Sequence, residues 1–102
     1  MAEASFIGYV GDADFHDGSV LGVEHRGRDV RIRVRGYSGK VFIAEFGGVQ
    51  AVRANRPEGM VLYSLSEMSA EPPLRRFAFT NWDEKGEAYL EIDATTFAVT
   101  EE

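Results

Sequence analysis

Residues 29–37 read Asp-Val-Arg-Ile-Arg-Val-Arg-Gly-Tyr, and this stretch decides the fold. Within it three aliphatic residues alternate strictly with three arginines. Successive side chains of a β-strand point to opposite faces, so the stretch predicts a strand with one apolar and one guanidinium face. The aliphatic residues are Val30, Ile32 and Val34, and the arginines are Arg31, Arg33 and Arg35.

On both sides of this stretch, short β-prone segments are separated by turn residues. This pattern predicts a mainly β protein of six to eight strands, folded as a single antiparallel sandwich, roll or partly open barrel. The last segment is expected to form one long strand, or two with a bend near Ala94 and Thr95. The expected strands cover residues 6–10, 19–25, 29–37, 40–46, 49–54, 75–82 and 88–99.

Two segments leave alternatives open. Gly47 and Gly48 suit a primed hairpin turn between two strands, but they suit a β-bulge as well. Residues 56–68 follow Asn55, and Glu58 stands three residues after this residue, as at a helix start. We therefore expect at most one short helix near residues 56–68, although the segment also permits a strand.

The composition predicts one globular domain over residues 1–102. The hydrophobic fraction is 44%, with seven Phe, four Tyr and one Trp, which excludes a disordered chain. Cysteine is absent, which removes disulfide and thiolate chemistry. The first ten residues lack the features of a signal peptide, and no apolar run approaches the ~20 residues that span a bilayer. We expect a cytoplasmic protein without a membrane partner.

The net charge of −6 is unevenly distributed. Residues 1–17 carry a net −4, residues 18–40 a net +4, and residues 83–102 a net −6. An acidic balance disfavours nucleic acid as a partner and favours a basic protein.

The connector over residues 11–18 collects oxygen and imidazole ligands, namely Asp12, Asp14, His16 and Asp17. An EF-hand loop beginning at Asp12 needs glycine at position 17 and an acid at position 23, where this chain has Asp17 and Val23. We expect an acidic turn and no metal or other cofactor. The alternative hypothesis is a small-ligand or metal-binding site, with His16, Asp17, Arg31, Arg33 and Arg35 as its residues.

The arginine face has two interpretations. It can bind phosphate, nucleic acid or an acidic protein, with Tyr37 on the same face for stacking. It can also be neutralised within the sheet, where Glu91 and Asp93 form a matching acidic row on another strand. The second interpretation is favoured, because no second basic element accompanies the arginines.

Trp82 ends a predicted strand and precedes a run of acids. It is therefore either an exposed residue that contacts a partner or a residue that covers one end of the hydrophobic core.

No motif of a hydrolase, kinase or dinucleotide-binding enzyme occurs, so we expect a protein that is not an enzyme. The main hypothesis is an interaction domain with a basic protein partner. Homo-oligomerisation through open sheet edges fits either function. The expected partner-binding residues are Trp82, Asp83, Glu84, Glu87, Asp14 and Asp17.

Two motifs carry a resemblance over residues 15–50. These are Phe-His-Asp-Gly-Ser-Val at 15–20 and Phe-Gly-Gly-Val at 46–49, with paired strands between them. In this arrangement the chain resembles small bacterial β proteins, including immunity proteins of polymorphic toxin systems and related uncharacterised families. The resemblance implies a non-catalytic inhibitor that covers the active site of a toxin. His16 and Asp17 are the positions that it singles out.

Overall fold

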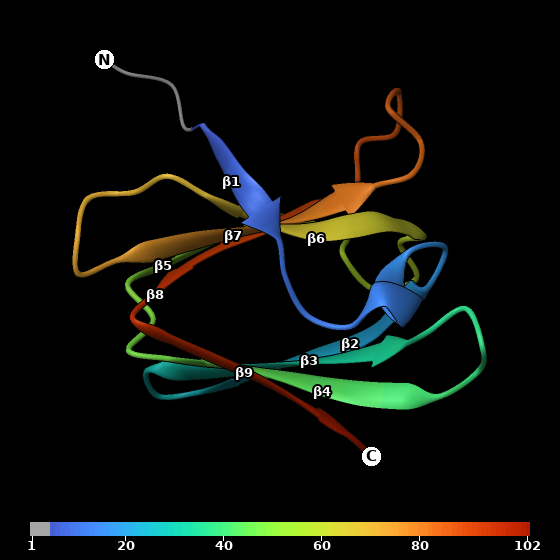
Figure 1. Cartoon of the computed structure of the whole chain (residues 1–102), viewed down its shortest axis with the longest axis horizontal. Coiled ribbons are helices and arrows are strands. Elements are labelled where there is room, and N and C mark those ends of the chain that lie inside the picture. Colours follow the sequence, from blue (N-terminus) through green and yellow to red (C-terminus); the bar gives the residue numbers. More distant parts are fainter. Residues whose placement is uncertain (1–4) are drawn as a thin grey trace.

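Two antiparallel sheets lie face to face in the computed structural model, which describes residues 5–102 (Figure 1). One sheet has the strand order β1-β6-β7-β8-β5, and the other has the order β2-β3-β4-β9. The predicted mainly β, antiparallel fold is confirmed, and of the sandwich, roll and barrel alternatives it is the sandwich. Residues 5–102 form nine strands instead of six to eight. The strands are β1 (Phe6–Tyr9), β2 (Ser19–Arg26), β3 (Asp29–Arg35), β4 (Val41–Gly47), β5 (Ala51–Asn55), β6 (Leu62–Met68), β7 (Arg75–Asn81), β8 (Tyr89–Ala94) and β9 (Thr96–Glu101).

Strand β3 has the two faces that its sequence predicts. Val30, Ile32 and Val34 are at most 2% exposed, whereas the arginines between them face solvent. Full burial of one such aliphatic side chain contributes roughly 1.5–3 kcal/mol, so this face stabilises the sandwich substantially.

Aromatic rings join the two sheets across the core. The Phe46 ring of β4 lies 5.1 Å from the Phe77 ring and 6.0 Å from the Phe79 ring, both of β7, in edge-to-face geometry. Leu90 and Ile92 of β8 are buried beside them. Edge-to-face pairs contribute about 0.5–1.5 kcal/mol beyond the buried area, so these contacts help to fix how the sheets stack.

The chain changes sheet twice at one place, between β4 and β5 and between β8 and β9. The backbone N–H of Thr95 donates to the Gly47 carbonyl at 2.9 Å, and its hydroxyl donates to the same oxygen at 3.2 Å. Of the two alternatives for Gly47 and Gly48, the hairpin is therefore excluded, because β4 and β5 belong to different sheets. The predicted bend near Ala94 and Thr95 is confirmed.

Residues 56–68 form a turn and a strand, so of the two alternatives for this segment the strand is confirmed and the short helix is absent. Met60 N–H donates to the Pro57 carbonyl at 3.1 Å, and Gly59 has a φ of +86°, which ends any helical path. Strand β6 then begins at Leu62, whose N–H donates to the Gly18 carbonyl at 2.8 Å. This segment therefore ties the start of β2 to the five-stranded sheet.

Helical structure among residues 5–102 is limited to the 3-10 turn η1 (Ala13–Phe15). No helix in this part of the chain is long and apolar enough to cross a membrane.

The Gly48 position gives a first testable prediction. Gly48 has a φ of +61°, and a Cβ there would overlap the Thr95 hydroxyl. Gly27, at +59°, has open space around it, so Gly27→Ala measures the backbone strain alone, about 1–2 kcal/mol. We expect Gly48→Ala to lower the free energy of unfolding in urea by roughly 2 kcal/mol more than Gly27→Ala does.

A double variant separates the overlap from the strain. Adding Thr95→Ala to Gly48→Ala removes the overlapping hydroxyl and should restore part of the lost stability. If Gly48→Ala and Gly27→Ala lowered the free energy of unfolding by the same amount, the close contact between residue 48 and Thr95 would have no effect on stability.

Candidate functional site

The connector between β1 and β2 is anchored in the core. The Asp12 carboxylate accepts the Asp14 N–H at 2.8 Å, which caps the 3-10 turn η1 at its start. At the end of this turn, Phe15 is 1% exposed, and its ring lies 5.4 Å from the Phe42 ring of β4. This burial positions the next residue, His16, at the surface between η1 and β6.

The acidic side chains of the connector diverge. Asp14 accepts hydrogen bonds from the Ser38 N–H at 3.0 Å and from the Ser38 hydroxyl at 2.6 Å, in the turn between β3 and β4. Asp12 caps η1, and Asp17 lies beside His16, with 3.9 Å from Oδ2 to Nε2. Within residues 5–102, no three His, Asp or Glu side chains gather closely enough to hold a metal ion.

His16, Tyr63 and Trp82 form a surface cluster, here called the aromatic surface. The rings of Tyr63 and Trp82 stack with centroids 5.3 Å apart and an interplanar angle of 17°. The His16 ring stands nearly perpendicular to both, at 5.1 Å and 5.6 Å. His16 Nδ1 lies 2.6 Å from the Tyr63 carbonyl oxygen, and a carbonyl only accepts, so Nδ1 carries the hydrogen.

The aromatic surface is open to solvent, since Trp82 is 52% and Tyr63 40% exposed. Trp82 therefore does not close the core, which was the alternative role considered for it. The sequence does not single out Tyr63, because the spacing of apolar residues around it also fits a helix. The register of β6 against β7 shifts between Leu62 and Ser64, so Tyr63 is an extra residue with no partner residue on β7. Its side chain is exposed, whereas Leu62 and Ser64 are buried.

The structure brings together some of the predicted partner-binding residues. Trp82 leads directly into an exposed loop that carries Asp83, Glu84 and Glu87. Asp17 reaches the same aromatic surface through its contact with His16. Asp14 lies apart from it, held at the β3–β4 turn.

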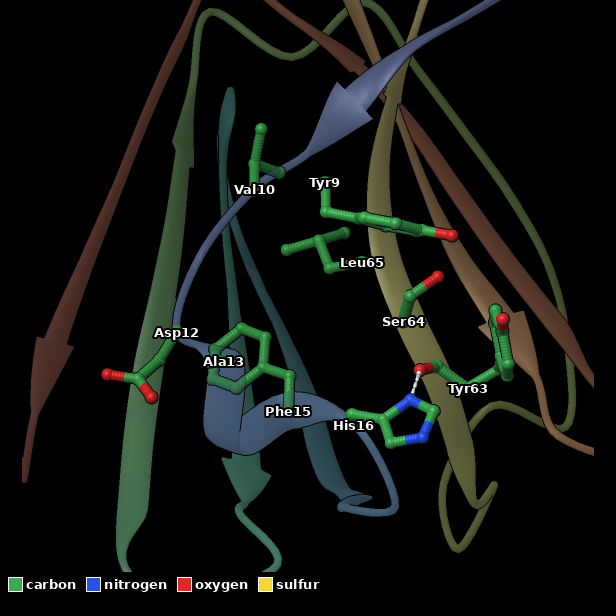
Figure 2. Close-up of a pocket in the computed structure, with 9 residues that line it drawn as sticks. All are labelled: Tyr9, Val10, Asp12, Ala13, Phe15, His16, Tyr63, Ser64 and Leu65. Atoms are coloured by element: carbon green, nitrogen blue, oxygen red, sulfur yellow. Dashed lines mark hydrogen bonds between the residues drawn. The ribbon is translucent and has the colours of Figure 1, made fainter.

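A pocket of about 400 Å³ lies between β1, η1 and β6, next to the aromatic surface (Figure 2). Phe15 and Leu65 form its floor but are each 1% exposed, so the accessible walls come mainly from the other residues. The neighbouring Tyr63 side chain raises the pKa of Tyr9 above its ordinary value. The lining residues are Tyr9, Val10, Asp12, Ala13, Phe15, His16, Tyr63, Ser64 and Leu65.

Two of the three arginines on the outer face of β3 are paired with carboxylates, but with other acids than expected. Arg31 pairs with Glu45 of β4 at 3.7 Å, and Arg33 pairs with Glu102 at 2.9 Å. Among residues 5–102, Arg35 has no carboxylate within 4 Å. Tyr37, at 76% exposed, lies in the turn that follows. The predicted pairing with Glu91 and Asp93 is wrong, because these acids belong to the other sheet.

Glu91 and Asp93 instead take part in an ionic network on the five-stranded sheet. Arg53 donates to Glu91 at 2.6 Å and to Asp93 at 2.8 Å, and Arg76 donates to Asp93 at 2.8 Å. Burial alone would raise the pKa of Asp93, but the hydrogen bonds from Arg76 and Arg53 outweigh it, so the pKa lies below its ordinary value. Asp93 is therefore ionised and structural.

Comparisons with known protein families, curated proteins and solved structures find no match to this chain.

The ionic network predicts acid sensitivity. The pKa of Asp93 is lower in the folded chain than in the unfolded chain, so its stabilisation is full above the unfolded value and is lost as pH falls below about 4. Arg53 and Arg76 are partly exposed, so we expect Asp93→Asn to cost about 1–3 kcal/mol in urea unfolding at pH 7. The difference in unfolding free energy between wild type and Asp93→Asn should become smaller as the pH falls.

Glu45→Gln provides the control, because it removes a carboxylate from a half-exposed pair whose expected contribution is about 0–1 kcal/mol. If Asp93→Asn had the same small effect, or lost as much stability at pH 3 as at pH 7, the network would not have the role described.

Trp82 is the chain's one tryptophan, so its fluorescence reports on the aromatic surface alone. We expect Tyr63→Ala to shift the emission to longer wavelength and to lower its anisotropy, because the stacked ring that shields and holds the indole is removed. Tyr89→Ala is the control, since Tyr89 is also half exposed but has no ring contact with Trp82 within residues 5–102. Identical spectra for both variants would contradict the stacking.

Proposed function

We propose that this chain is a non-enzymatic protein-interaction domain that binds a basic partner through the aromatic surface and the acidic loop beside it. The observation that supports this most strongly is the stacked, half-exposed pair of Tyr63 and Trp82. Large aromatic side chains held rigid at a surface lose little conformational freedom on binding, and they dominate the binding energy of many interfaces.

The charge around the aromatic surface supports a cationic partner. Asp17 lies beside His16, and Asp83, Glu84 and Glu87 follow Trp82 in the loop. The face of an indole ring attracts a guanidinium or ammonium group, by roughly 0.5–2 kcal/mol. An arginine or lysine of the partner can thus contact the Trp82 ring and a nearby carboxylate at the same time.

A specific form of this function is an immunity-type inhibitor that covers the active site of a toxin. The resemblance over residues 15–50 supports it, together with the lack of any reaction motif in the sequence. His16 and Asp17, which the resemblance singles out, both belong to or border the aromatic surface.

The second candidate is a small-ligand domain that uses the pocket of Figure 2. Its volume of about 400 Å³ and mostly apolar lining suit a small organic molecule. A ligand that binds the folded state raises its melting temperature by mass action. Thermal shift with nucleotides, divalent cations and aromatic carboxylates therefore discriminates the two candidates.

The test of the main proposal is affinity capture from the source cell, with wild type, Trp82→Ala and Tyr37→Ala as baits. Tyr37 is the matched control, because it is an exposed aromatic residue in the turn between β3 and β4. We expect one basic protein to be retained by wild type and Tyr37→Ala and to be lost from Trp82→Ala. In direct binding, Trp82→Ala should weaken affinity at least about tenfold, as truncating an interface anchor does.

The purified pair then tests the electrostatic part of the proposal. The association rate should fall steeply as salt rises, because the acidic loop attracts the partner before contact. A partner that binds Trp82→Ala as well as wild type, or a rate indifferent to salt, would contradict the proposal.

A further inference from the structure

Strand β1 leaves an unusual edge on the five-stranded sheet. It has the sequence Phe-Ile-Gly-Tyr, pairs only with β6 among residues 5–102, and therefore has backbone N–H and C=O groups on its other side without a strand partner. Its large side chains are also uncovered, with Phe6 54%, Ile7 61% and Tyr9 66% exposed. Both its backbone and its side chains thus offer an apolar template for another strand.

The other three edge strands of the described sandwich each carry at least one charged residue. Strand β5 carries Arg53, and β9 carries Glu101. Strand β2 carries Glu24, His25 and Arg26 over its second half. Its first half is hydrogen-bonded to residues 59 and 60. Charges on an edge strand oppose sheet-to-sheet pairing, and β1 is the one edge strand of the described sandwich that has no charged residue.

We propose that β1 pairs antiparallel with β1 of a second copy of this chain, about a two-fold axis. A two-fold interface places a patch against itself, so any charged residue near the axis meets its own like charge. Strand β1 is uncharged throughout, although the chain as a whole carries −6, and it is therefore the edge that meets a copy of itself without repulsion.

The pairing joins the two five-stranded sheets into one continuous sheet. Phe6 and Tyr9 already contact each other with ring centroids 5.0 Å apart, and the same side chains of the second strand extend this apolar row. Tyr9 also lines the pocket of Figure 2, so the second copy forms an additional wall beside it. Tyr9 also neighbours Tyr63 of the aromatic surface. Ile7, whose substitution tests the interface, is not a residue of that surface, so the two proposals are tested separately.

The experiment is sedimentation velocity of the whole chain from about 1 µM to about 1 mM, a range that covers weak association. We expect a reversible shift from 11.3 kDa to twice this mass. Ile7→Lys should weaken the association at least about tenfold, because it places two like charges close together at the axis. Tyr37→Lys adds the same charge at an exposed turn and should leave the association unchanged.

A mixture of two oppositely charged variants distinguishes charge repulsion at the interface from misfolding of a single variant. Ile7→Lys and Ile7→Glu should each remain monomeric, and their equimolar mixture should form heterodimers, after circular dichroism has shown that both variants fold. A wild type that stays monomeric throughout would overturn the proposal. So would a dimer that Ile7→Lys leaves intact, or a mixture that does not associate.

Discussion

Burial of one aliphatic face against a second sheet is the constraint on which the rest of this structure depends. Val30, Ile32 and Val34 lose almost all contact with water when they pack into the core between the two sheets. Because a strand has a period of two, this burial also fixes Arg31 and Arg33 on the outside. The ion pairs of that outer face follow from the same register.

The period of two explains what the sequence predicts well and where it misleads. It correctly predicts β3, and the change of period near Ala94 marks where the last segment divides into β8 and β9. It fails at β6, where both Leu62 and Leu65 are buried because a register shift lies between them. The three-residue spacing of Leu62 and Leu65 is also typical of a helix. For this reason the sequence does not identify Tyr63 as a surface residue of the aromatic surface.

Strand order accounts for the second group of errors. Alternation along one strand says which side chains share a face, but it does not say which strand lies opposite. The alternation of Glu91 and Asp93 is therefore compatible with ion pairs to the arginines of β3. The strand order instead places these two acids in the other sheet, beside Arg53 and Arg76. In the same way, two adjacent glycines are equally compatible with a hairpin and with the crowded passage of a chain between two sheets.

The candidate binding surface is formed by aromatic side chains that do not contribute to the hydrophobic core of the sandwich. Trp82 follows the last residue of β7, and Tyr63 is the extra residue of the register shift in β6, so neither ring fills the core. A large aromatic pair that adds little to the core has a cost, since its apolar area stays in contact with water. Because neither ring belongs to the core, their exposure at the surface is consistent with the proposed role in binding, and their substitution separates binding from folding.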